Sequence, residues 1–125
     1  MFLEISKDKS IRDIQQDFNQ HWPFLKLEFY KPADQTTTKK HLPGFTLLSA
    51  AGFKKGNSIM EVKNGMTVAE LEGKFRNEYG LEVQVSRKSG LLWLETTMTD
   101  NWSLEKQNEH GRDISLTPKV YPDTE

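Results

Sequence analysis

A pattern of short strands and capped helices occurs twice in this chain, at a constant offset of 57 residues. Residues 1–22 align with residues 58–79, and apolar strand and helix positions coincide in the two segments. The apolar helix positions recur at spacings of three and four residues, which predicts one buried face on each helix. These positions are Ile11, Ile14 and Phe18 in the first segment and Val68, Leu71 and Phe75 in the second.

Each predicted helix begins at a residue suited to cap it. Ser10 and Thr67 occupy equivalent positions, and a hydroxyl there accepts a hydrogen bond from a free backbone N–H of the first turn. An acidic residue follows three positions later, as a capping box requires. Because Glu70 is longer than Asp13, we expect Thr67 and Glu70 to form the fuller box.

Two successive strand–helix–strand units favour an α+β fold of the ferredoxin-like sandwich type. Four strands would form one antiparallel sheet with the first and third strands central and both helices on one face; another strand order is the alternative. Ser89 and Gly90 predict a turn into an additional hairpin strand at one edge. The expected segments of this single domain, residues 1–125, are the first unit (1–31), a long connection (32–57), the second unit (58–88), the edge strand and a short helix ended by Gly111 (91–111) and an irregular tail (112–125).

Composition narrows the class of protein. The chain is 35% hydrophobic and 28% charged with a net charge of −1, so it has no general attraction for nucleic acid or anionic lipid. It has no cysteine, which excludes disulfides, thiol nucleophiles and thiolate metal sites. No stretch has the length and apolarity of a signal peptide or a membrane span. We expect a soluble, cytoplasmic protein with no membrane partner.

No motif predicts catalysis, a metal or a cofactor. His21, His41 and His110 are scattered, and none has a second ligand at metal-binding spacing. Ser49 lacks the flanking glycines of a nucleophile elbow, and residues 52–58 lack the spacing of a phosphate-binding loop. We therefore name no catalytic residue and favour a non-catalytic protein.

The strongest local candidate for a binding surface is residues 91–102. If residues 91–97 form an edge strand, unpaired backbone groups become available to a partner strand. Tryptophan is common at interface hot spots. The candidate binding residues are Trp93, Glu95, Thr97, Asp100 and Trp102. Alternatively, Trp93 covers the end of the core and Trp102 fixes the last helix.

A second hypothesis is a small-molecule binding protein or enzyme, with a pocket between the sheet and the 32–57 segment. Glu4 and Glu61 would then lie on neighbouring central strands, and two close carboxylates raise the pKa of one of them. Lys54 and Lys55 would supply positive charge. The alternative is that these carboxylates form a solvated or covered surface without a function.

Nucleic-acid binding is not favoured. Ferredoxin-like sheets that bind RNA use aromatic side chains on the open face. Here the strand alternation places carboxylates on that face, at Glu4, Glu28, Glu61 and Glu82. The remaining basis for nucleic-acid binding is four lysines, Lys39, Lys40, Lys54 and Lys55, and such binding would depend steeply on salt.

Several stretches of the chain resemble a family of small, uncharacterised bacterial α+β proteins. The motifs are LEVQVSRKSGLLWLETTMTDNWSLEKQN, IRDIQQDFNQHWPFLKLEFYK and the TVAEL helix start. The resemblance covers most of the chain apart from the 32–57 segment and the tail. It implies one complete soluble domain, and it implies no activity and no catalytic residues. Independently of the resemblance, the edge strand and the two tryptophans favour a module that binds a protein partner or forms a homodimer.

Overall fold

The computed structural model describes residues 1–31 and 40–116. Positions 32–39 of the predicted connection and 117–125 of the predicted tail lie outside the described residues. The elements in chain order are β1 (Phe2–Ile5), α1 (Ile11–His21), β2 (Leu25–Tyr30), α2 (Leu48–Ala51), β3 (Ser58–Glu61), α3 (Val68–Tyr79), β4 (Glu82–Ser89), β5 (Leu92–Glu95), the 3-10 helix η1 (Thr97–Thr99) and α4 (Leu104–Leu116).

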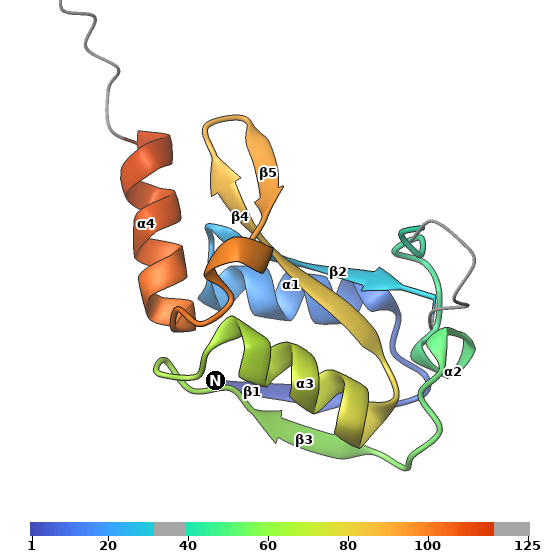
Figure 1. Cartoon of the computed structure of the whole chain (residues 1–125). Helices are drawn as coiled ribbons and strands as arrows, with labels where there is room; N and C mark the ends of the chain where they lie inside the picture. Colours follow the sequence, from blue (N-terminus) through green and yellow to red (C-terminus); the bar gives the residue numbers. More distant parts are fainter. Residues whose placement is uncertain (32–39, 117–125) are drawn as a thin grey trace, which may run out of the picture.

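The predicted α+β class is confirmed, but the strands are distributed over two sheets (Figure 1). β1 pairs with β3 in one antiparallel sheet, and β2, β4 and β5 form a second antiparallel sheet in that order. The expected single sheet with both helices on one face is therefore not found in the described residues. The β1–β3 pair was expected, whereas the pairing of β2 with β4 was not. Alternation in a strand predicts which face is buried, but it does not predict the neighbouring strand.

The two ladders are centred on equivalent positions of the two halves. Leu3 pairs with Met60, 57 residues later. Glu28 pairs with Gln84, 56 residues later, because the first half contains one extra residue before β2. An antiparallel pair between equivalent residues has a two-fold axis at its centre. The halves therefore have an approximate two-fold arrangement, in which each half contributes one strand to each ladder.

This arrangement extends beyond the predicted units into the segments that follow β2 and β4. In each half, the backbone just before a late helix pairs with the start of α1 or α3. Three pairs of backbone hydrogen bonds are equivalent in the two halves. Ile11 N donates to Thr46 O (2.8 Å), as Val68 N does to Trp102 O (3.2 Å), and Arg12 N donates to Gly44 O (2.8 Å), as Ala69 N does to Asp100 O (2.8 Å). In the opposite direction, Leu48 N donates to Lys9 O (2.9 Å), as Leu104 N does to Met66 O (2.8 Å). α2 and the first turn of α4 thus occupy corresponding places.

One hydrophobic core joins the two sheets and the helices. Leu3 and Met60 from the first ladder belong to the same buried cluster as Leu27 and Val85 from the second. α1 packs against β1 and β2, and α3 packs against β4. The helix positions predicted to be buried are buried: Ile11, Ile14, Phe18, Val68, Leu71 and Phe75.

The last helix is longer than expected. Gly111 was predicted to end it, but α4 continues to Leu116, so residues 112–116 of the predicted tail are helical. A Cβ atom at position 111 would lie 3.0 Å from Arg87 Cγ and 3.0 Å from Phe24 Cβ. The glycine therefore permits close packing of α4 on β4, and its role is not to terminate the helix. Ser115 Oγ then accepts from Gly90 N at the hairpin turn, at 3.1 Å.

Candidate functional site

The two edges of the three-stranded sheet, at β2 and at β5, differ in how their outer backbone groups are hydrogen-bonded. The outer edge of β2 is closed by other parts of the chain. Its backbone carbonyls at Leu25, Leu27 and Phe29 accept hydrogen bonds from Asn19 Nδ2 (2.9 Å), Gln15 Nε2 (2.8 Å) and Leu42 N (2.8 Å), respectively. A strand from another molecule cannot add at β2 without breaking these bonds.

The outer edge of β5 is open among the described residues. Only β4 pairs with β5 in the ranges 1–31 and 40–116. Thr96 N, just after β5, donates to Val85 O of β4 at 3.2 Å. Because bonding alternates along an antiparallel strand, the even-numbered residues of β5 direct their backbone groups toward β4. Trp93 and Glu95 therefore direct their N–H and C=O groups away from the sheet. Figure 1 shows β5 on the side of the hairpin away from α4.

The side chains around this edge are unusually apolar. Leu92 and Leu94 are 66% and 44% exposed, and Leu91 and Met98 at the two ends of β5 are almost fully exposed. Natural edge strands usually carry charges, prolines or bulges that discourage pairing with other chains. The combination of open backbone groups and exposed leucines is typical of a surface that binds another polypeptide.

Trp93 lies on the outer face of the sheet and outside the core cluster. Lys26 Nζ and Lys88 Nζ lie 5.8 and 5.9 Å from its ring centroid, within the range of a cation–π interaction. The ring also borders a shallow hollow of about 320 Å³ that is lined by Arg12, Gln15, Gln16, Asn19, Lys26 and Trp93. Trp93 therefore offers an indole face in a positively charged setting.

Trp102 is on the opposite side of the hairpin. Its ring lies 5.7 Å from the Arg87 guanidinium carbon and 4.3 Å from Lys106 Nζ, and it meets His110 edge-on at 5.4 Å. Arg87 and Lys88 are consecutive in β4, so their side chains point to opposite faces of the strand. The two tryptophans are thus not brought together, and Trp102 packs between β4 and α4.

The other predicted binding residues have different surroundings. Glu95 lies at the open edge, and its carboxylate accepts from Tyr30 OH at 3.5 Å. Thr97 is exposed in η1, directly after the strand. Asp100 uses its backbone carbonyl to accept from Ala69 N at the start of α3. Of the predicted set, Trp93 and Glu95 lie in β5 at the open edge, and Thr97 follows the strand in η1. Asp100 and Trp102 contact α3, and Trp102 also contacts α4.

A chain of polar contacts on the outer face was not anticipated. Lys26 Nζ lies 2.8 Å from Glu28 Oε1, and Glu28 Oε2 lies 3.4 Å from His41 Nδ1. His41 Nε2 is 2.9 Å from Tyr30 OH. Burial, reinforced by Glu95 and Glu28, raises the pKa of Tyr30 to about 12. The Tyr30 hydroxyl is therefore protonated near neutral pH, and it donates to Glu95 Oε1 at 3.5 Å.

The sequence signal for this polar chain was weak. Lys26, Glu28 and Tyr30 alternate along β2, so they share one face, and this much was predictable. His41 lies in the connection, eleven residues after Tyr30, and the isolated bridge between these two residues sets its position. No spacing rule identifies such a partner, because the contact depends on the path of the connection.

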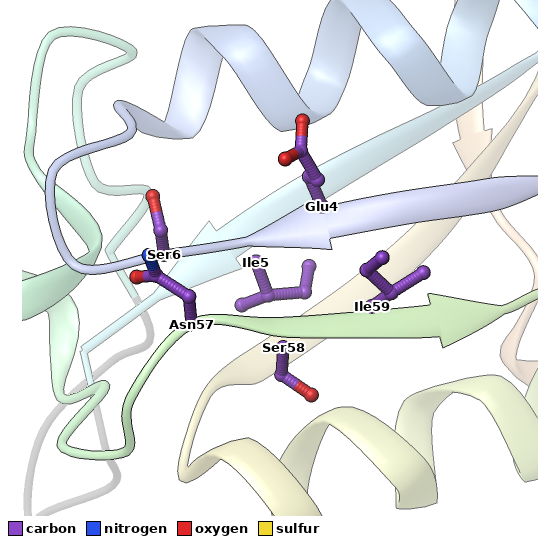
Figure 2. Close-up of a pocket in the computed structure, with 6 residues that line it drawn as sticks. All are labelled: Glu4, Ile5, Ser6, Asn57, Ser58 and Ile59. Carbon is purple, nitrogen blue, oxygen red and sulfur yellow. The ribbon is translucent and has the colours of Figure 1, made fainter.

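The residues proposed for an alternative pocket are spread over separate places. Glu4 lines a hollow of about 460 Å³ beside Ile59 (Figure 2), and Lys9 Nζ lies 3.6 Å from its carboxylate. Glu61 lines a different hollow of about 480 Å³, with Lys63 Nζ at 3.9 Å. Neither Lys54 nor Lys55 lines these two hollows. Both lysines are exposed, and Lys55 Nζ lies 5.9 Å from the Tyr79 ring.

Comparisons with protein-family models, with curated proteins and with solved structures gave no match for this chain. Within the described ranges, no helix combines the length and the apolarity needed to cross a membrane. The same residues contain no group of three or more His, Asp or Glu side chains placed to hold a metal ion.

Proposed function

We propose that this protein is a non-catalytic interaction module that binds a polypeptide through the open edge of β5. The observation that carries the proposal is the difference between the two edges of one sheet. Side chains from α1 and the backbone of Leu42 close the edge at β2. At the β5 edge, the backbone N–H and C=O groups of Trp93 and Glu95 point away from the sheet. Leu92 and Leu94 are exposed on the sheet face opposite the Trp93 side chain.

The energetics of such an edge favour strand addition. Each backbone hydrogen bond to an added strand contributes about 0.5–1.5 kcal/mol net, since the groups were previously bonded to water. Burying apolar surface adds roughly 25 cal/mol per Å². Leu92, Leu94 and Trp93 would supply most of that surface. The side chains beside the strand then select the partner.

The proposal includes a cytoplasmic location and a relationship to small bacterial proteins. A chain without cysteine suits the reducing cytoplasm. The resemblance to small, uncharacterised bacterial proteins supports an origin among them and adds no activity. A protein partner, including a second copy, is favoured over nucleic acid because the β5 edge offers backbone groups and exposed leucines, which suit a polypeptide strand.

Substitution of Trp93 by alanine tests the proposal. Because Trp93 lies outside the core, Trp93→Ala should leave the melting temperature nearly unchanged while removing self-association or partner retention in native mass spectrometry. Phe45→Ala is the matched control, since Phe45 is an exposed aromatic residue, 66% exposed, and lies outside the hairpin. A large loss of stability in Trp93→Ala, with assembly intact, would contradict the proposal.

A second candidate function is a small-molecule binding protein or enzyme. One observation favours it: His41, from the 32–57 segment, reaches the outer face of β2 and contacts both Tyr30 and Glu28. The adjacent hollow at Trp93 and Arg12 combines an indole with a cation. A monomer that retains a small-molecule mass in the same mass-spectrometric measurement would favour this candidate over the interaction module.

A further inference from the structure

We infer that the polypeptide that binds the β5 edge is a second copy of this chain. The two β5 strands would run antiparallel around a two-fold axis at Leu94 and would join the two sheets into one of six strands. This inference rests on the proposed function, because it requires β5 to be an interface, and it identifies the partner and the register.

The register follows from the shortness of β5. Only Trp93 and Glu95 within the strand direct backbone groups outward, because even-numbered residues face β4. Leu91 belongs to the turn that precedes the strand, and Thr97 belongs to η1. A two-fold axis at Leu94 places Trp93 opposite the partner's Glu95 and Glu95 opposite the partner's Trp93. Both outward residues of each copy are then paired.

Other two-fold registers are worse. An axis at Glu95 would place two carboxylates directly opposite each other, and like charges in that position are destabilising. It would also leave Trp93 opposite a residue of the partner's η1. An axis at Trp93 would place Glu95 opposite the partner's Leu91, which is not in the strand. Only the axis at Leu94 avoids both problems.

The side chains of both faces complement themselves in this register. On one face, Leu94 meets the partner's Leu94, with Leu92 of each copy on the diagonal, so four exposed leucines become covered. On the other face, the indole of Trp93, which lies near Lys26 and Lys88, meets the partner's Glu95. Because the axis is two-fold, each contact occurs twice. In each one, the lysines near Trp93 of one copy lie beside the Glu95 carboxylate of the other copy. The charge pattern therefore fits a second copy.

Access to this edge is open in the described part of the chain. α4 packs on β4 and contacts the hairpin at Ser115, which accepts from Gly90 N. In Figure 1 the hairpin of β4 and β5 extends away from the paired strands β1 and β3, with α4 beside β4 and with β5 on the far side. Two copies can therefore approach edge to edge without displacing a described helix.

Cysteine crosslinking tests the register directly, because the natural chain contains no cysteine. Two residues at a non-hydrogen-bonded antiparallel position have Cα atoms about 4.5 Å apart, which a disulfide can span. Leu94→Cys should form a covalent dimer on mild oxidation. Leu91→Cys is the control: residue 91 is 96% exposed, yet the two copies of it would be roughly 20 Å apart along the paired strands.

We expect Leu94→Cys to crosslink at least about ten-fold faster than Leu91→Cys, because pairing holds the two thiols at a high effective concentration. Equal rates, or faster crosslinking through Leu91→Cys, would show collision without this register and would overturn it. Sedimentation of the natural chain and of Leu94→Asp supplies the second measurement. The natural chain should self-associate with concentration, and Leu94→Asp should remain monomeric with an unchanged melting temperature.

The outcomes separate the two proposals. A natural chain that is monomeric at every concentration overturns the second copy as the partner. If that monomer still retains a different protein that Trp93→Ala releases, the interaction module stands without the dimer. If a dimer forms equally in the natural chain, Leu94→Asp and Trp93→Ala, another surface is the interface, and both proposals fail.

Discussion

The two halves of this protein use the same set of backbone bonds and differ at the end of the sheet. In the first half, α1 covers the outer edge of β2 through Gln15 and Asn19. In the second half, the equivalent outer edge of β4 is covered by β5, which adds a new edge with no described cover. The comparison shows that an approximate two-fold arrangement can contain one closed and one open edge. The open edge is formed by the four residues of β5, Leu92–Glu95.

The side chains that bond each helix to its neighbouring strand also differ at equivalent positions: one donates a hydrogen bond and the other accepts one. Gln15 in α1 donates from Nε2 to Leu27 O, whereas Glu72 in α3 accepts from Val85 N at 2.9 Å. Position 72 corresponds to position 15 at the offset of 57. The same helix face thus fastens each strand, with a donor in one half and an acceptor in the other.

The largest effect is expected at the two equivalent core phenylalanines. Phe18→Ala and Phe75→Ala should each lower the free energy of unfolding by about 3–5 kcal/mol, because both rings are fully buried. Phe75 also packs edge-on against Phe29 at 5.9 Å, and such pairs contribute roughly 0.5–1.5 kcal/mol more. We therefore expect the greater loss in Phe75→Ala, measured by urea denaturation. A greater loss in Phe18→Ala would contradict this order.

An intermediate effect is expected at the helix attachments. Gln15→Glu replaces the donor to Leu27 O by a carboxylate and should cost about 1–3 kcal/mol. Glu72→Gln keeps an acceptor for Val85 N and should cost less than about 1 kcal/mol. Gln16→Glu, at an exposed neighbouring position, is the control for added charge on α1. Equal losses in Gln15→Glu and Gln16→Glu would show that the bond to Leu27 contributes nothing.

The smallest effect is expected at the helix caps, which differ from the sequence prediction. The reciprocal box closes at Ser10 and Asp13, where Asp13 Oδ2 accepts from Ser10 N at 3.0 Å. At Thr67 the Glu70 carboxylate accepts from the hydroxyl instead, at 3.1 Å. The backbone hydrogen bond from Ser10, with that from its side chain, lowers the pKa of Asp13 below its ordinary value of 3.8.

The direction of the pH dependence follows from that shift. Because the folded-state pKa of Asp13 is lowered, its stabilising contribution is present above pH 3.8 and is lost as pH falls through the folded-state value. Asp13→Asn should therefore be less stable than the natural chain at neutral pH, and the difference should shrink in acid. Thermal unfolding at a series of pH values measures it. A difference that stays constant well below pH 3.8 would show that the carboxylate is not responsible.

Much of the local structure was predictable from particular residues. The spacing of Ile11, Ile14 and Phe18 predicted the buried face of α1, and the turn at Ser89 and Gly90 predicted the hairpin. The extension of the two-fold arrangement into residues 44–51 and 100–107 was not predictable. Only Leu48 and Leu104 are identical between residues 44–51 and 100–107. The equivalent contacts there are backbone hydrogen bonds, which many side chains permit, so the sequence shows little of them.

The candidate site was predictable in part. Trp93 and Glu95 were identified because an edge strand with a tryptophan suggests an interface, and the structure places both at the open edge. Trp102 was grouped with Trp93 because the two are close in sequence. The pleat of β4 separates them, since Arg87 and Lys88 point to opposite faces. His41 was missed because its contacts depend on a connection that carries no periodic signal.

By itself, the sequence determined where most of the strands and helices begin and which faces of α1 and α3 are buried. Those properties depend on residues three or four apart in a helix, or two apart in a strand, and on capping residues such as Ser10 and Thr67. Only the tertiary structure decided that β2 pairs with β4 and that the strands form two sheets. An apolar strand face can be buried against many neighbours. The choice among them depends on the packing of the whole core, and the same choice leaves β5 as the open edge.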